Sequence, residues 1–189
     1  MGEGLVERLR REPDLDLTVT WLPFELHPDT PQEGVSLLQK LGHLSAPQLE
    51  MMMAELRQRA AGLGLPFNPP PTLFNTRRAL QLAEFGRDRG RLDHLHRPLF
   101  QAYFVDGANL SDEGVLRRVA EAAGLDADAG LAAVREGRYA RRLADAAAEA
   151  DRYGVRAVPT FIINDRYKVV GAQPYEKLRE ILRTVAREG

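Results

Sequence analysis

Strand-like patterns occur at only two places in this sequence, and a long helical stretch separates them. Residues 15–21 alternate apolar and polar side chains, the period of a strand with one buried face. Residues 155–163 and 167–171 are apolar runs joined by a turn, which predicts a β-hairpin. From about residue 35 to residue 153 almost every segment has helical period. The chain is therefore predicted to form an α/β fold that carries a large helical insertion.

Helix boundary signals support this order. A short helix is predicted at residues 3–11, before Pro13, and another follows Pro174 at the end of the chain. Within the helical stretch, Ser45 is a predicted N-cap, Asn75 and Thr76 open a further helix, and Ser111 is the predicted cap of residues 112–124.

Composition excludes several classes of function. The chain has 26 Lys and Arg against 27 Asp and Glu, so the net charge of −1 gives no support to a nucleic-acid partner. No apolar run is long enough to span a membrane, and residues 1–16 lack the apolar core of a signal peptide. We therefore predict a cytoplasmic protein with no membrane partner. The absence of cysteine excludes disulfides, thiolate metal sites and a cysteine nucleophile in this chain.

Pro159 stands at the start of a strand-like run in "GVRAVPTF". Proline has no backbone N–H, so it is disfavoured inside a paired strand. The local sequence leaves two interpretations open. One is a trans proline at the first residue of the strand, and the other is a turn with a cis Val158–Pro159 bond.

Five segments together resemble one known family, in the order in which that family has them. They are "VTWLPFELHP", "FNTRRALQLAEFGRDRG", "LFQAYFVDGANLSDEGVLRRVAEAAGLD", "YGVRAVPTFIIN" and "VVGAQPYEKL". The chain resembles the DsbA-like thioredoxin family, and within it the FrnE-like branch that includes 2-hydroxychromene-2-carboxylate isomerases. The resemblance implies a thioredoxin-like fold, with a discontinuous domain at 1–27 and 138–189 and a helical insertion domain at 28–137. It also implies that the Val158–Pro159 bond is cis.

The redox end of such a protein is not in this sequence. Redox members begin with a strand that runs into a C-x-x-C motif at the start of the first helix. This chain starts "MGEGLVERL", so it lacks the usual first strand and both cysteines. We expect the C-x-x-C segment upstream of Met1, which leaves no catalytic residue in this chain. The alternative is a cysteine-free relative that has lost the chemistry.

The resemblance also suggests residues that bind substrate. Val158 and Pro159 would hold the partner beside the thiols. Phe24 and Glu25 follow the strand-like residues 15–21 and would border the pocket, although Glu25 could equally be an ordinary loop carboxylate. Asn75 and Thr76 correspond to residues near the substrate pocket of the isomerases, although capping a helix is the simpler role and both can hold together. No metal site is predicted. His94 and His96 lie two apart, point to different sides of a helix, and are expected to face solvent.

Three functions remain open. The first is a protein disulfide oxidoreductase acting on thiol- or disulfide-bearing proteins without a cofactor. The second is an isomerase or transferase that uses glutathione and a serine, and that acts on small aromatic molecules. The third is a non-catalytic binding protein, with a homodimer or a partner strand completing its sheet. Whether this chain is itself an enzyme is left undecided by its lack of cysteine.

Overall fold

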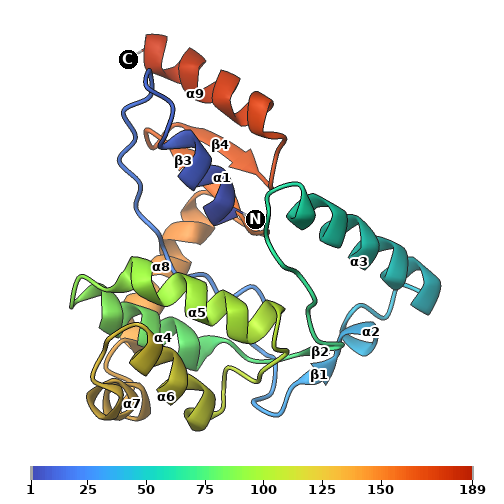
Figure 1. Ribbon diagram of the computed structural model, residues 1–189, viewed down its shortest axis with the longest axis vertical. Coiled ribbons are helices and arrows are strands. Elements are labelled where there is room, and N and C mark those ends of the chain that lie inside the picture. The colour runs from blue at the N-terminus through green and yellow to red at the C-terminus, as the bar shows by residue number, and fades with distance from the viewer. Residues whose placement is uncertain (1, 189) are drawn as a thin grey trace.

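The computed structural model describes residues 2–188, which form a helix-rich α/β structure (Figure 1). The first half contains α1 Gly2–Leu9, β1 Val35–Ser36, α2 Leu37–Lys40, α3 Ala46–Ala61, β2 Thr72–Leu73 and α4 Arg77–Arg87. The second half contains α5 Leu92–Phe104, α6 Glu113–Ala122, α7 Ala127–Arg135, α8 Ala140–Arg152, β3 Thr160–Ile163, β4 Tyr167–Val170 and α9 Tyr175–Glu188. No helix among the described residues is long and apolar enough to cross a membrane.

The largest hydrophobic core lies in the helical block formed by α4, α5, α6 and α7 (Figure 1). Leu82, Leu95 and Leu116 are fully buried there. Gly86 brings α4 close to α5, because a Cβ on Gly86 would lie 2.2 Å from Cδ1 of Leu95. The helical block therefore has a core of its own.

The predicted β-hairpin is confirmed. β3 and β4 are antiparallel, with Thr160 opposite Val170 and Ile163 opposite Tyr167. Three residues connect the strands, and the first two of them, Asn164 and Asp165, have φ values of 50° and 54°, the left-handed backbone of a type I′ turn. The Arg166 N–H closes this turn on the Ile163 carbonyl at 3.1 Å.

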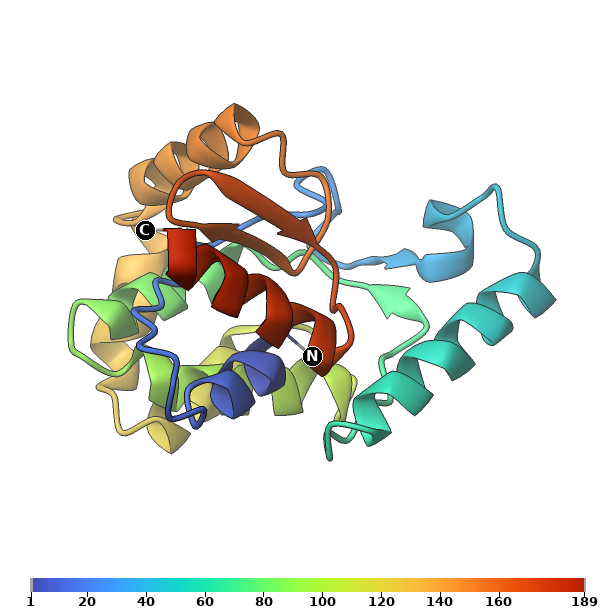
Figure 2. The same ribbon diagram turned by 90° about the horizontal axis from the view of Figure 1, so that it is seen from above.

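A second core joins this hairpin to the two ends of the chain. α9 lies along the hairpin in both views, and α1 lies on the α9 side of it (Figures 1 and 2). Their side chains share one apolar cluster with Leu15 and with β3 and β4; its buried members are Leu5, Leu9, Leu15 and Leu178, and Phe161 and Val169 pack against it. The two termini of the sequence are thus held together by one hydrophobic core.

Residues 15–21 do not form the strand that their period predicts. The side chains alternate as in a strand, since Leu15 is buried while Asp16, Thr18 and Thr20 are exposed. Within residues 2–188, however, the sheets contain only the pairs β1–β2 and β3–β4. A strand is held by backbone hydrogen bonds to a neighbour, so an alternating segment without one stays extended but unpaired.

The start of α6 also differs from the prediction. Asp112, and not Ser111, is the N-cap, because its Oδ1 accepts a hydrogen bond from the Val115 N–H at 2.9 Å. The hydroxyl of Ser111 instead donates to the carbonyl of Asn75 at 3.1 Å. Aspartate and serine are both good caps, so the local sequence cannot decide between neighbours.

Candidate functional site

The start of α1 meets the loop before β3. A Cβ placed on Gly2 would lie 2.8 Å from Cβ of Pro159, so only a glycine allows the two backbones this close. The Val158–Pro159 peptide bond is cis. The loop is fixed on both sides, since Gly171 N–H donates to the Pro159 carbonyl at 2.8 Å and the Thr160 hydroxyl donates to the Ala157 carbonyl at 2.7 Å.

Val158 is the exposed part of this contact. Its side chain is apolar, and the residue is 52% exposed. Among the described residues no backbone hydrogen bond involves the N–H or C=O of Val158. Both groups are therefore free to pair with an extended segment of another molecule, in the way that an edge strand pairs.

Asn75 joins the loop at Thr30 to the start of α4. Its Nδ2 donates to the Thr30 carbonyl at 2.6 Å, and its Oδ1 accepts from the Arg77 N–H at 2.9 Å. Thr76 follows at the N-cap position of α4. These bonds confirm that Asn75 opens the helix, and its role in substrate binding stays a prediction.

Glu25 lies in the same cluster of contacts as Asn75, because both bind Arg77. Its carboxylate accepts two hydrogen bonds from Arg77, at 2.9 and 3.0 Å, and this pairing raises the pKa of Arg77 above its usual value. Phe24 beside it is half-buried. The interactions found within residues 2–188 join Glu25 to Arg77 and Asn75, whereas Gly2 contacts Pro159. The predicted site residues therefore form two separate groups of contacts.

His96 contradicts the expectation that it faces solvent. Its side chain is 14% exposed, and its Nδ1 lies 3.2 Å from Oε1 of Glu3. The indole of Trp21 meets the imidazole edge to face, with ring centroids 5.4 Å apart. The sequence did contain a signal, because His96 shares a helix face with Leu92 and Leu99, which lie four residues before and three after it.

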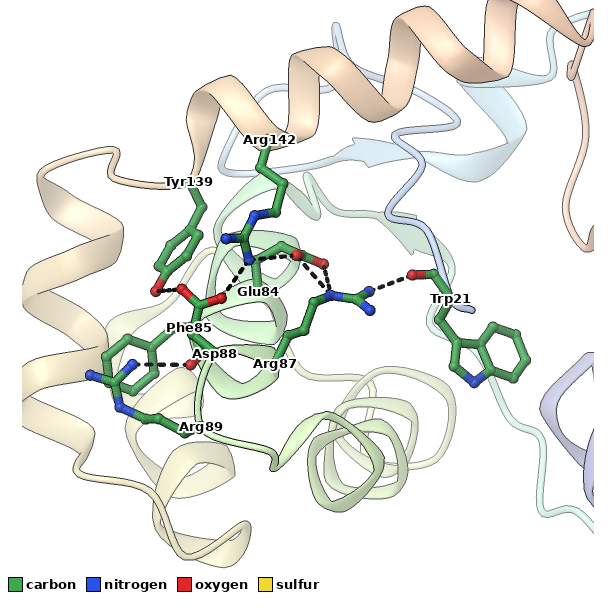
Figure 3. A network of polar contacts seen from close by, with 8 residues as sticks. All are labelled: Trp21, Glu84, Phe85, Arg87, Asp88, Arg89, Tyr139 and Arg142. Atoms are coloured by element: carbon green, nitrogen blue, oxygen red, sulfur yellow. Dashed lines mark hydrogen bonds and ion pairs between the residues drawn. The ribbon is translucent and has the colours of Figure 1, made fainter. Parts of the chain in front are cut away.

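The buried carboxylate of Glu84 links residues 15–21 to the helical block through Arg87 (Figure 3). Glu84 has a side chain that is 2% exposed, and it accepts hydrogen bonds from Arg87 on its own helix and from Arg142 on α8. Arg87 also donates to the carbonyl of Trp21. This network was missed from the sequence, because a glutamate in a helix is ordinarily exposed.

Asp88 extends this network toward the solvent (Figure 3). It accepts hydrogen bonds from Arg142 at 2.8 Å and from the Tyr139 hydroxyl at 2.8 Å. The bond from Arg142 holds the pKa of Asp88 below its usual value. A hollow beside these residues is also lined by Arg138 and Arg141, but each of those guanidiniums is paired with a carboxylate. The three arginines that line this hollow, Arg138, Arg141 and Arg142, are therefore all paired with carboxylates.

The residues that could hold a metal ion are dispersed. Within residues 2–188 no group of three or more His, Asp or Glu side chains is arranged to bind a metal.

The architecture is that of a thioredoxin-like protein with a helical insertion. A hairpin, two helices against it and a proline loop that faces the start of α1 are joined to a separate helical core. A model of the DsbA-like thioredoxin domain matches residues 3–183, so the chain belongs to the DsbA-like thioredoxin family. The predicted family and fold class are both confirmed.

Known proteins resemble the chain over most of its length. The uncharacterised protein YwbO of Bacillus subtilis is 30% identical over 158 residues, which are 79% of this chain and 74% of YwbO. A probable DsbA oxidoreductase from Streptomyces coelicolor superposes with a TM-score of 0.92 and 27% identity, covering 100% of this chain and 84% of that one. A 2-hydroxychromene-2-carboxylate isomerase shares the fold, with a TM-score of 0.71, 17% identity, and coverage of 97% and 86%. The isomerase is consistent with the FrnE-like branch.

Proposed function

We propose that the protein functions in DsbA-type thiol–disulfide exchange, with its reactive cysteines in a C-x-x-C segment that precedes Met1. The observation that carries this proposal is the contact between the backbone of Gly2 and the ring of Pro159. The proposed C-x-x-C segment would join the chain next to this contact with the Val158–Pro159 loop. The probable oxidoreductase from Streptomyces coelicolor, which is similar over the whole of this chain, supports the same activity.

The start of α1 suits a thiolate. The first N–H groups of a helix have no partner within it, and they carry a partial positive charge. A thiol placed there loses its proton more easily, and the thiolate is the form that attacks a disulfide. Val158 would hold the other partner, because its backbone groups are free and its side chain is exposed.

The unpaired segment at residues 15–21 supports a strand in the same upstream polypeptide. This segment alternates in burial like a strand, and it shares a hydrophobic cluster with β3 through Leu15, Leu17 and Phe161. An extended strand between the two would give both of them hydrogen-bond partners. We propose that this strand leads directly into the C-x-x-C segment.

The first experiment is to sequence the DNA upstream of the Met1 codon and to translate it in frame. An open frame that encodes an apolar strand, typically of about five or six residues, followed by C-x-x-C is the expected result. A serine in place of the first cysteine would contradict the disulfide proposal and favour the glutathione-dependent isomerase. An immediate stop codon would also contradict it and favour a binding protein.

The extended protein is then expected to accelerate the reduction of insulin disulfides by dithiothreitol, by at least about tenfold over buffer. The 189-residue chain is the matched control, and it should match buffer because it has no cysteine. An extended protein with both new cysteines changed to serine should also match buffer. An intact C-x-x-C protein that does not exceed these controls would contradict the proposal.

A further inference from the structure

Three segments that are distant in sequence meet at His96. Its Nδ1 lies 3.2 Å from the carboxylate of Glu3 in the first turn of α1. Its ring contacts Trp21, at the end of the extended segment, and it lies beside Phe100 on its own helix. Glu3 is 27% exposed at its side chain, so this polar contact is partly shielded from water.

The first turn of α1 has few other contacts to hold it. It reads "GEG", so Glu3 is the one side chain beyond a hydrogen atom among residues 2–4. Leu5 and Leu9 anchor the later turns of the helix in the second core. A helix of eight residues has little stability of its own, so its first turn depends on tertiary contacts.

We propose that His96 is a positioning residue, which acts through Glu3 to hold the first turn of α1 against the Val158–Pro159 loop. Gly2 touches Pro159, and Glu3 is the next residue in the chain. The polar contact of His96 with Glu3 therefore lies one residue away from the contact between Gly2 and Pro159. The importance of this for catalysis rests on the proposed function, but the structural role does not.

Two substitutions separate the polar contact with Glu3 from the packing of the ring. His96→Asn keeps a polar group near the position of Nδ1 but removes the ring, whereas His96→Phe keeps an aromatic ring but removes the polar contact. Histidine, asparagine and phenylalanine have similar helix propensities, so the pair is matched in that respect. Hydrogen exchange of the backbone amides of residues 6–8 is measured by mass spectrometry on the 189-residue chain. In the helical pattern these N–H groups bond the carbonyls of residues 2–4, so their exchange reports how firmly the first turn is held.

In H96F we expect these amides to exchange about fivefold faster than in the wild type, the effect of losing one partly exposed polar contact to a carboxylate. In H96N the rate should stay within about twofold of the wild type. Glu3→Ala should match H96F, and the double variant should be no faster than either single one, because both remove the same contact. Rapid exchange in H96N together with wild-type exchange in H96F would show that the ring is what matters, and would overturn the proposal. So would equal rates in H96N and H96F.

Folding is monitored separately through the single tryptophan, Trp21, by urea unfolding. The hydrogen-exchange test needs no thiol, so its failure would leave the proposed thiol–disulfide exchange standing. Conversely, a stop codon upstream of Met1 would contradict thiol–disulfide exchange but would leave the hydrogen-exchange result intact. If the role of His96 and the proposed function both hold, the extended H96F protein should reduce insulin disulfides more slowly than extended H96N.

Discussion

Replacement of Glu84 by alanine is expected to lower the free energy of unfolding by about 2–3 kcal/mol. The carboxylate is 2% exposed and accepts from Arg87 and Arg142. Its removal leaves two guanidiniums without their shared partner and loosens the link from Arg87 to the Trp21 carbonyl. The estimate lies at or below the lower end for a buried pair, because the arginines are 30% and 43% exposed and water can compensate part of the loss. Urea unfolding followed by Trp21 fluorescence measures it.

Two controls define the origin of this loss. Glu84→Gln keeps the size of the side chain and one acceptor oxygen, so it should cost about 1 kcal/mol. Glu149→Ala removes an exposed carboxylate on α8 that lies 3.7 Å from Arg152, and it should change stability by less than about 0.5 kcal/mol. If Glu84→Ala were no more destabilising than Glu149→Ala, the network would contribute nothing measurable to the fold.

Replacement of Leu95 by alanine is expected to cost about 3 kcal/mol, since this side chain is fully buried in the helical block. Gly86→Ala should cost about 1–2 kcal/mol, because its new methyl would lie 2.2 Å from Cδ1 of Leu95. In the double variant the methyl of residue 86 enters the space left by Leu95. The clash then disappears, and the greater helix propensity of alanine remains as a gain.

The two effects should therefore be non-additive by at least about 1 kcal/mol, which urea unfolding of the four proteins measures as a double-mutant cycle. Gly62→Ala is the matched control. Gly62 has αR backbone angles at the end of α3, and no atom lies within 3.4 Å of the Cβ that alanine would add. The free energy of unfolding of the Gly62→Ala protein should therefore stay within about 0.5 kcal/mol of the wild type. Simple additivity of Gly86→Ala and Leu95→Ala would show that the block relaxes around the extra methyl.

Local sequence predicted the elements whose causes are local. The hairpin followed from two apolar runs around a short polar turn, and β3 and β4 form it. The helix after Asn75 and Thr76 begins at Arg77, with Asn75 accepting the first free N–H. Such features depend on residues within one or two turns of each other, so a single sequence contains the information.

The candidate site was predictable only in part. Pro159 was conspicuous because a proline at the start of an apolar run has few structural explanations. Its contact with Gly2 was not predicted, since it joins residues at opposite ends of the chain. Phe24, Glu25, Asn75 and Thr76 were chosen from the resemblance, and their part in substrate binding stays a prediction. The structure adds that Asn75 holds Thr30, a residue 45 positions away.

The sequence by itself determined which faces of many segments are apolar, and that no thiol chemistry can arise from these 189 residues. Tertiary structure decided which partner each face and each polar group found. Residues 15–21 have the period of a strand yet remain unpaired, because the period specifies a buried face and not a hydrogen-bonding neighbour. His96 and Glu84 became buried for the complementary reason. Their partners Glu3 and Arg142 come from distant helices, and burial of a polar side chain is favourable only once such a partner is in place.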